Sequence, residues 1–266
     1  MFNQYKQQSP FRLYQVETNK HSWNIFPLAV ADQQQHIEQS EALFTQPVAR
    51  PTLYWSIAEP TGLVLGFSQK HEVLNPLALE DKSGIPIYHR RAGGTAVLVG
   101  PHLLSLDVFL PTDHPLILAD VVESYRWFGE AWVLALQSLN VQTRIVPIEE
   151  AHAQRALLKK PETQEYERLM NRACYGSLSP YEVVVGQRKV VGLDMIRRRT
   201  GTLLQAGVLL TWETERLAYL LGHTDEEQCL LSEGLLKRAV GLETLAGRVV
   251  TANEVREAFE HVLLLQ

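Results

Sequence analysis

Cysteine is scarce in this chain of 266 residues: only Cys174 and Cys229 occur, too few for a disulfide framework or a zinc cluster. Long apolar runs are also missing. No stretch of about 18 apolar residues is present, so no segment is predicted to span a membrane. The first ten residues are polar, rich in glutamine, and lack the apolar centre of a signal peptide. These absences predict a cytoplasmic protein.

Positive charge is in the minority, with 25 Lys and Arg against 30 Asp and Glu and a formal net charge of −5. Because phosphate backbones bind basic faces, nucleic acid is not the expected partner. The nine histidines show no HExxH or similar spacing, and we expect no metal. Neither a P-loop nor a GxSxG motif is present. The hydrophobic fraction of 45% is sufficient for a sizeable core.

Hydrophobic periodicity and turn signals predict runs of strands interrupted by one long helix and followed by helices, a pattern typical of the α+β class. We predict an extension at 1–22, a catalytic core at 23–212, and a C-terminal helical part of the same domain at 213–266. The expected helices cover 26–44, 119–139 and 254–265, with a charged, helical or mobile stretch at 154–172; the expected strands cover 52–57, 63–67, 85–88, 93–98, 103–110, 141–146, 181–185, 189–196 and 203–210.

The first segment with possible chemistry runs from His89 to Val97 and contains Arg90, Gly93 and Gly94. Two glycines allow the backbone to pass close to a ligand, and arginine binds carboxylates and phosphates in a bidentate manner. Taken alone, the segment is more often a simple turn beside two surface arginines.

Cys174 lies in a loop rich in Gly, Ser and Pro, outside any apolar run. The thiolate is the reactive form of cysteine, and nearby positive charge favours it. Arg172, Arg188 and Lys189 supply that charge if the hairpin folds back. Lys189 enters an apolar strand after a turn, so it points either into a cleft or, as spacing alone favours, into solvent.

A glycine inside the strand at 203–210 indicates a bulge, close approach of a ligand, or tight packing against a neighbour. Cys229 lies on an expected helix and is interpreted as a small core residue. The run Arg197–Arg199 is interpreted as a solvated turn, with docking of an acidic carrier protein as the alternative.

In their order along the chain, these segments resemble motifs of the biotin/lipoate protein ligase superfamily. The likeness covers roughly Trp23 to Leu210. Its parts are the entry strands with Thr52–Trp55 and Gly66–Gln69, the ligand loop Arg90–Val97, the lysine motif Lys189–Gly192, and Gln205–Gly207 where histidine-glycine is frequent.

Within the superfamily, the chain is most similar to the lipoate-ligase-like octanoyl-[acyl carrier protein]:protein octanoyltransferases. Their nucleophilic cysteine precedes the lysine, and here the separation is 189 − 174 = 15 residues. The shared pattern is Cys174-Tyr175, Ser179-Pro180, Tyr181-Glu182, Val183–Val185, Gly186 and Lys189. The departures are Gly192-Leu193-Asp194-Met195 for Gly-Ser-Ala-Gln, Ala206 for histidine, and a displaced His102.

The resemblance implies the class II synthetase/biotin-lipoate ligase fold, a mixed, largely antiparallel sheet flanked by helices. It implies Cys174 as nucleophile and Lys189 as the group that holds the thioester oxygen. The donor would be octanoyl-acyl carrier protein and the acceptor a lipoyl domain or glycine-cleavage H protein, without a cofactor. The implied substrate-binding residues are Arg90, Gly93, Gly94, Ala96, Gly192, Gln205 and Gly207.

Three alternatives stay open. One is an ATP-dependent lipoate–protein ligase, which needs no cysteine nucleophile. Another is an amidotransferase that moves octanoyl from protein to protein through a cysteine. The third is a non-catalytic binding protein that keeps the fold, for which the altered residues at 192–195 and Ala206 are the best support.

Overall fold

The computed structural model describes residues 23–80 and 84–264, so the expected extension at 1–22 lies outside the described residues. Within the described part, the main sheet has eight strands in the order β1-β3-β7-β11-β10-β9-β8, with β2 also pairing with β3. The β1 and β2 strands run parallel to β3, and the other pairs are antiparallel. The strands are β1 (Asn24–Ile25), β2 (Ala29–Ala31), β3 (Thr52–Ala58), β7 (Leu103–Leu110), β8 (Arg144–Ile145), β9 (Val183–Val185), β10 (Arg188–Arg198) and β11 (Gly201–Leu209).

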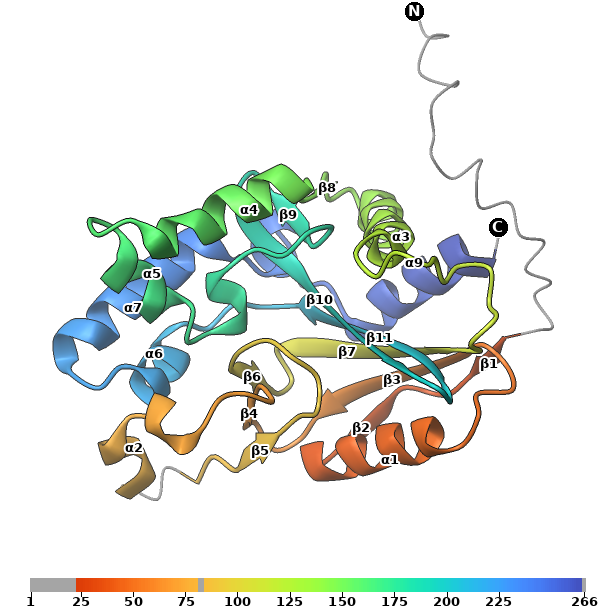
Figure 1. The fold of residues 1–266 in the computed structure, drawn as a ribbon, viewed down its shortest axis with the longest axis horizontal. Coiled ribbons are helices and arrows are strands. Elements are labelled where there is room, and N and C mark those ends of the chain that lie inside the picture. Colours follow the sequence, from red (N-terminus) through yellow and green to blue (C-terminus); the bar gives the residue numbers. More distant parts are fainter. Residues whose placement is uncertain (1–22, 81–83, 265–266) are drawn as a thin grey trace, which may run out of the picture.

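Both faces of the central strands are buried, because helices cover them on either side (Figure 1). Alternate residues of a strand point to opposite faces. Trp55 therefore packs toward α3 (Arg126–Ser138) and α9 (Ala252–Leu264), while Tyr54 packs with Phe44 of α1 (Gln33–Thr45) on the other face. This two-sided burial explains the almost continuous apolar character of β3 and β7.

A second sheet of three strands stands beside the main one, in the order β5-β4-β6. Its strands are β4 (Gly62–Leu65), β5 (Ile87–His89) and β6 (Val97–Val99). The chain between β5 and β6 is the expected ligand loop, so this small sheet presents Arg90–Ala96 to the main sheet. The short elements η3 (His71–Val73) and α2 (Pro76–Glu80) lie between β4 and β5 in the chain.

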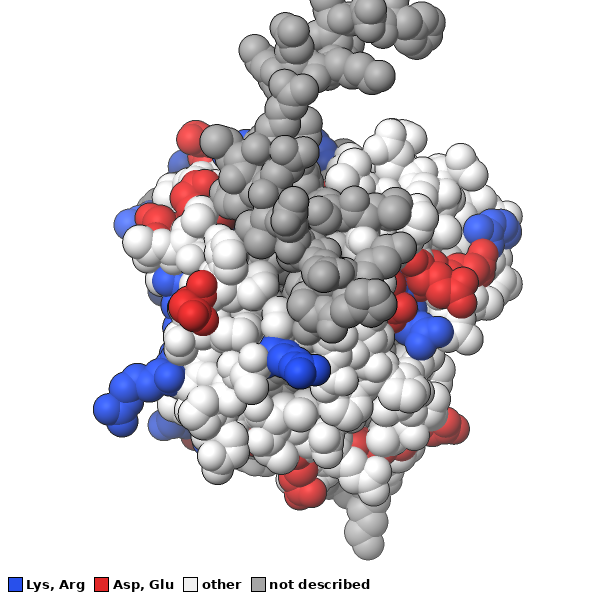
Figure 2. Space-filling view, turned by 90° about the vertical axis from the view of Figure 1, so that its right-hand side faces the viewer, with Lys and Arg blue, Asp and Glu red and all other residues white. Residues whose placement is uncertain are grey.

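The remaining helices are η4 (Glu123–Tyr125), α4 (Ile148–Ala156), η5 (Leu157–Lys159), α5 (Gln164–Met170), η6 (Cys174–Gly176), α6 (Glu215–Leu221), α7 (Asp225–Arg238) and α8 (Leu242–Ala246), with η4 directly preceding α3. Of these, α4, α5, α6 and α7 lie together on the left in the view of Figure 1. On the face in Figure 2, where atoms of the described residues are visible, basic side chains are scattered between acidic ones and form no basic patch.

The α+β class and most of the predicted elements are confirmed, including β7 with the predicted bounds. The helix predicted at 26–44 is wrong in its first half. Residues 29–31 form β2 against Ser56–Ala58, and α1 begins only after Asp32, whose carboxylate caps Gln34 N at 2.7 Å. An apolar spacing compatible with a helix cannot reveal a short edge strand that depends on pairing with a distant partner.

The bounds of several other predicted helices and strands differ from those in the structure. The helix predicted from residue 119 begins at Arg126, because residues 119–122 form a turn ahead of η4. The strand predicted at 93–98 is loop until Val97, and the strand at 141–146 shortens to β8. The charged stretch at 154–172 contains α5 and the end of α4. Thr251 is the cap of α9, with its hydroxyl 3.2 Å from Glu254 N.

Phe259 joins α9 to the rest of the core, and its replacement tests this packing. Its ring is fully buried and lies 4.3 Å from the Trp132 ring and 5.8 Å from the Trp55 ring, between centroids. We predict that Phe259→Ala lowers the free energy of unfolding by about 3–5 kcal/mol in urea titrations, because it leaves a cavity among aromatic rings. Glu257→Ala, on the exposed side of α9, is the control. Equal midpoints for the two variants would contradict the packing.

Candidate active site

A cavity of about 620 Å³ lies between the ligand loop, the loop that contains Cys174 (residues 173–180, here called the cysteine loop), α1 and the β10–β11 hairpin. Most of the site residues expected from the sequence line it. Gly93 and Ala96 lie outside its wall, Gly93 on an exposed bend and Ala96 buried behind the loop. The expected residues on the wall are Arg90, Gly94, Cys174, Lys189, Gly192, Gln205 and Gly207.

Ala96 contributes through its backbone, by fixing the cysteine loop. Cys174 N donates to Ala96 O at 2.7 Å, and Ala96 N donates to Arg172 O at 3.1 Å. Gln69 Nε2 adds a donor to the same Arg172 oxygen at 3.0 Å, while its Oε1 accepts from Gly66 N. Loops about 80 residues apart in the chain are therefore held together by backbone and amide hydrogen bonds.

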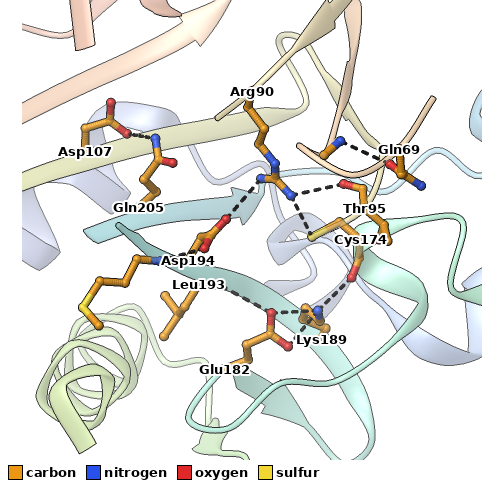
Figure 3. Close-up of polar contacts among 12 residues, drawn as sticks. Gln69, Arg90, Thr95, Asp107, Cys174, Glu182, Lys189, Leu193, Asp194 and Gln205 are labelled. Atoms are coloured by element: carbon orange, nitrogen blue, oxygen red, sulfur yellow. Dashed lines mark hydrogen bonds and ion pairs between the residues drawn. The ribbon is translucent and has the colours of Figure 1, made fainter. Parts of the chain in front are cut away.

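Lys189 is almost fully buried at 1% exposure, so its interpretation as a solvated hairpin lysine is wrong. Its ammonium has three short contacts, one to Cys174 O at 2.9 Å and two to Glu182, at 2.8 Å to Oε1 and 2.7 Å to Oε2 (Figure 3). An ammonium group has three N–H donors, so this set leaves none unmatched. Lys189 thereby fixes the carbonyl of the cysteine whose sulfur lines the cavity.

Glu182 is the partner that sequence reasoning missed, although it stands in the shared Tyr-Glu pattern. Its carboxylate is buried and also accepts hydrogen bonds from Ser179 N at 2.7 Å and Leu193 N at 3.4 Å. Burial raises the pKa of Glu182, whereas the Lys189 ammonium and these N–H donors favour its ionised form. A charged residue that leads an apolar strand, seven residues before a lysine, was the signal available in the sequence.

Arg90 brings positive charge to the sulfur of Cys174. Its Nη2 lies 4.0 Å from Cys174 Sγ and donates to Thr95 O at 3.1 Å, and its Nη1 lies 4.0 Å from Asp194 Oδ2 (Figure 3). Gly94 has a φ of +84°, and a Cβ there would stand 2.5 Å from Arg90 Nη2. Glycine at this position therefore leaves room for the guanidinium.

Gly192 and Gly207 face each other on β10 and β11 and accommodate an aromatic ring. The Tyr175 hydroxyl donates to Gly207 O at 2.7 Å, and a Cβ on Gly207 would lie 2.9 Å from that hydroxyl. Glycine at 207 thus leaves room for the hydroxyl of Tyr175, the residue after the cysteine, whereas a Cβ on Gly192 would lie at an ordinary contact distance of 3.6 Å from the same atom. Ligand contact by these glycines stays a prediction.

Gln205 belongs to a buried polar cluster that sequence reasoning did not find. Its Nε2 donates to Asp107 Oδ1 at 2.8 Å, and Asp107 Oδ2 lies 2.6 Å from Ser40 Oγ and 3.2 Å from His36 Nε2. Burial alone raises the pKa of Asp107, but His36, Ser40 and Gln205 outweigh it and hold that pKa below its usual value. An aspartate in the middle of the apolar segment 103–110 was the available signal.

Three further sequence interpretations need correction or placement. Cys229 is exposed on α7 and is not a core residue, because the buried stripe of this helix passes through Leu231 and Leu235. The solvated turn at 197–199 is wrong for two of its arginines: Arg197 donates to Leu118 O at 2.6 Å, and Arg198 pairs with Glu41 at 3.2 Å. The displaced His102 is buried and lies 2.9 Å from Leu98 O, so it serves the turn before β7.

The chain belongs to the lipoyl protein ligase A/B catalytic domain family, whose sequence profile matches residues 32–264. It is 31% identical to the octanoyltransferase LipM of Exiguobacterium sibiricum over 79% of this chain and 72% of that one. It is 24% identical to the octanoyltransferase LipM of Staphylococcus aureus, over 90% and 84% of the two chains.

Solved structures agree on the fold. A bipartite lipoate protein ligase from Thermoplasma acidophilum, studied with its E2 lipoyl domain, superposes with a TM-score of 0.68 at 18% identity, covering 91% of this chain and 82% of that chain. A lipoate-protein ligase A bound with ATP superposes with a TM-score of 0.65 at 18% identity, over 91% and 84% of the chains. The expected superfamily, fold class and acyltransferase activity are confirmed.

Two further findings concern the described residues alone. None of their helices is both long and apolar enough to cross a membrane. Among them, no group of three or more His, Cys, Asp or Glu side chains is arranged to hold a metal ion. The division at residues 22 and 212 and the roles of the individual site residues stay predictions.

Substitutions of Lys189 and Glu182 test whether their ion pair stabilises the fold. We predict that Lys189→Met costs about 3–5 kcal/mol of unfolding free energy, because it leaves a buried carboxylate without its cation. Adding Glu182→Gln should recover most of that loss, since a neutral amide still accepts from Ser179 N. Urea titrations measure both. Arg188→Ala, one residue away and only half-buried, is the control and should lose less than about 1 kcal/mol. A double variant no more stable than Lys189→Met would refute the pairing.

Proposed function

We propose that this protein transfers an octanoyl group from acyl carrier protein, through a thioester on Cys174, to a lysine of a lipoyl domain or glycine-cleavage H protein. One observation carries the proposal: the sulfur of Cys174 lines the cavity beside Arg90, while a buried lysine holds the carbonyl of the same residue. The names of the related octanoyltransferases support the acyl group, and the lipoyl domain studied with the Thermoplasma ligase supports the acceptor.

The first transfer acylates the cysteine. The Cys174 thiolate attacks the carbonyl carbon of the donor thioester, a new C–S bond forms, and the thiol of the carrier leaves with a proton. Arg90 supplies positive charge beside the reacting sulfur. Lys189 reaches a thioester oxygen only by releasing one of its three acceptors, so its proposed role is charge stabilisation after such an exchange.

An apolar wall next to the cysteine fits the tail of the acyl group. Val64, Val99 and Leu103 form one buried cluster with the ring of Tyr175, and Val97 and Cys174 pack against it. Burial of a seven-carbon tail at roughly 0.8 kcal/mol per CH₂ contributes about 5 kcal/mol, which is enough to select for chain length.

The alternatives differ in the use of the cysteine and in the donor. The mechanism of an ATP-dependent ligase does not use a cysteine, so it leaves Cys174 on the cavity wall unexplained. The solved ligase with ATP is similar to this chain in fold, at 18% identity. An amidotransferase would use the same Cys174 with an octanoylated protein as donor.

A cytoplasmic location also stays a prediction.

The cysteine assignment predicts a clear contrast between the two thiols. Cys174→Ser should lower the rate of acceptor octanoylation by at least about a thousandfold, because the hydroxyl is a far weaker nucleophile than a thiolate. Cys229→Ser, at an exposed position, should keep the wild-type rate. The rate is measured by mass spectrometry of the acceptor domain. If the Cys174→Ser variant modified the acceptor at the wild-type rate, Cys174 would not be the nucleophile.

The donor assignment predicts that turnover requires a thioester and no nucleotide. Octanoyl-acyl carrier protein alone should support modification of the acceptor, whereas free octanoate or lipoate with ATP and magnesium should not. An octanoylated H protein offered as donor distinguishes the amidotransferase. Modification only in the ATP mixture would make the protein a ligase, and modification only from the octanoylated protein would make it an amidotransferase.

A further inference from the structure

Asp194 differs from the other carboxylates on the cavity wall, because one of its oxygens receives no hydrogen bond from the described residues. Glu41 pairs with Arg91 and Arg198, and Asp107 and Glu182 are engaged as described above. Asp194 Oδ1 accepts from Met195 N at 2.8 Å. Its Oδ2 is buried without a hydrogen-bond partner among the described residues, and Arg90 Nη1 stands 4.0 Å away, beyond hydrogen-bond distance.

A second acceptor lies beside Asp194. Gln205 is its direct partner on β11, so the two side chains share a face of the sheet. The amide nitrogen of Gln205 is committed to Asp107, which turns the amide oxygen away from that carboxylate (Figure 3). Two side chains on the cavity wall therefore offer hydrogen-bond acceptors next to each other, an arrangement that suits a group with N–H donors and positive charge.

This pair lies close to the nucleophile. A single guanidinium, that of Arg90, stands 4.0 Å from Cys174 Sγ on one side and 4.0 Å from Asp194 Oδ2 on the other. Among the described residues, Arg90 makes one hydrogen bond shorter than 3.5 Å, to Thr95 O, and its Nε is buried without a hydrogen-bond partner. A cation that enters the cavity can thus replace the guanidinium at Oδ2.

The second half of the proposed reaction needs such a site. The acceptor lysine arrives as an ammonium ion, whose pKa in water is about 10.4, and an ammonium has no lone pair with which to attack a thioester. Burial raises the pKa of Asp194, which makes it a stronger base than an ordinary carboxylate, although Arg90 and the Met195 N–H oppose this. Tyr125 of η4 also lies near Asp194, and its own pKa is raised by burial and by Asp194.

We propose that Asp194 is the general base of the second transfer and that, with Gln205, it receives the ε-ammonium of the acceptor lysine. This inference rests on the proposed function. Asp194 Oδ2 takes one proton from the ammonium, and the freed lone pair forms the C–N bond with the acyl carbon. The C–S bond breaks, its electron pair goes to Cys174 Sγ, and the sulfur takes the second proton that the nitrogen loses. The proton on Asp194 then passes to water.

A buried carboxylate oxygen without a hydrogen bond is costly, so Asp194 Oδ2, which receives none from the described residues and has the Arg90 guanidinium 4.0 Å away, calls for a function. Capture and deprotonation of an amine supply one.

The test separates the two half-reactions. Wild type and Asp194→Asn are first acylated with octanoyl-acyl carrier protein, and the acyl-enzyme is isolated and mixed with excess acceptor domain in single turnovers. Acylation should stay within about threefold of wild type. Transfer to lysine at pH 7 should fall by about a hundredfold or more, and this deficit should shrink as pH rises, because more of the lysine is then already deprotonated.

Hydroxylamine provides the second measurement, since it is uncharged at neutral pH and cleaves thioesters without a base. The Asp194→Asn acyl-enzyme should react with hydroxylamine at the wild-type rate. Glu257→Gln, which alters an exposed carboxylate on α9 outside the cavity wall, is the matched control and should leave both transfers unchanged.

The outcomes separate this inference from the function on which it rests. Normal acylation with an unchanged lysine transfer overturns the role of Asp194 alone, as does an equal loss with lysine and hydroxylamine, which would indicate a distorted site. Failure of the wild-type enzyme to form any acyl-enzyme overturns the proposed function, and the role of Asp194 with it.

Discussion

The buried ion pair between Lys189 and Glu182 is the interaction on which the site depends. Two opposite charges this far from water are stable only when each is paired and hydrogen-bonded, and here the third donor of the ammonium goes to the carbonyl of Cys174. The pair therefore couples the β9–β10 hairpin to the cysteine loop. Because β10 pairs with β11, and β11 pairs with β7, the position of Cys174 is fixed relative to the central strands of the sheet.

The cavity beside the Lys189–Glu182 ion pair has parts with different chemistry. Valines and leucines of the small sheet and of β7 make an apolar wall beside the sulfur. Another part of the wall is polar, with Asp194 and Gln205 in register on β10 and β11. Arg90, from the loop that the small sheet presents, stands between them. An acyl tail on one side and an incoming amine on the other fit this division, and the sulfur lies where they meet.

Much of this could be predicted from the sequence, and the limits have physical causes. Strands such as 103–110 and the hairpin before Lys189 follow from local patterns, because their apolar character is continuous and turns bound them. Short strands such as β2 depend on a distant partner, so their own residues resemble the start of a helix. Likewise, Cys174, Lys189 and Arg90 were predicted through the resemblance, whereas Asp107, Glu182 and Asp194 acquire meaning only from neighbours that folding brings together.

In the proposed mechanism, the sulfur of Cys174 carries the acyl group between donor and acceptor. The mass of the intact protein after brief incubation with octanoyl-acyl carrier protein, followed by peptide mapping, tests this role. We expect a gain of one octanoyl group, located on the peptide that contains Cys174 and removed when the acceptor domain is added. An unchanged mass while the acceptor still becomes octanoylated, or an adduct confined to Cys229, would contradict it.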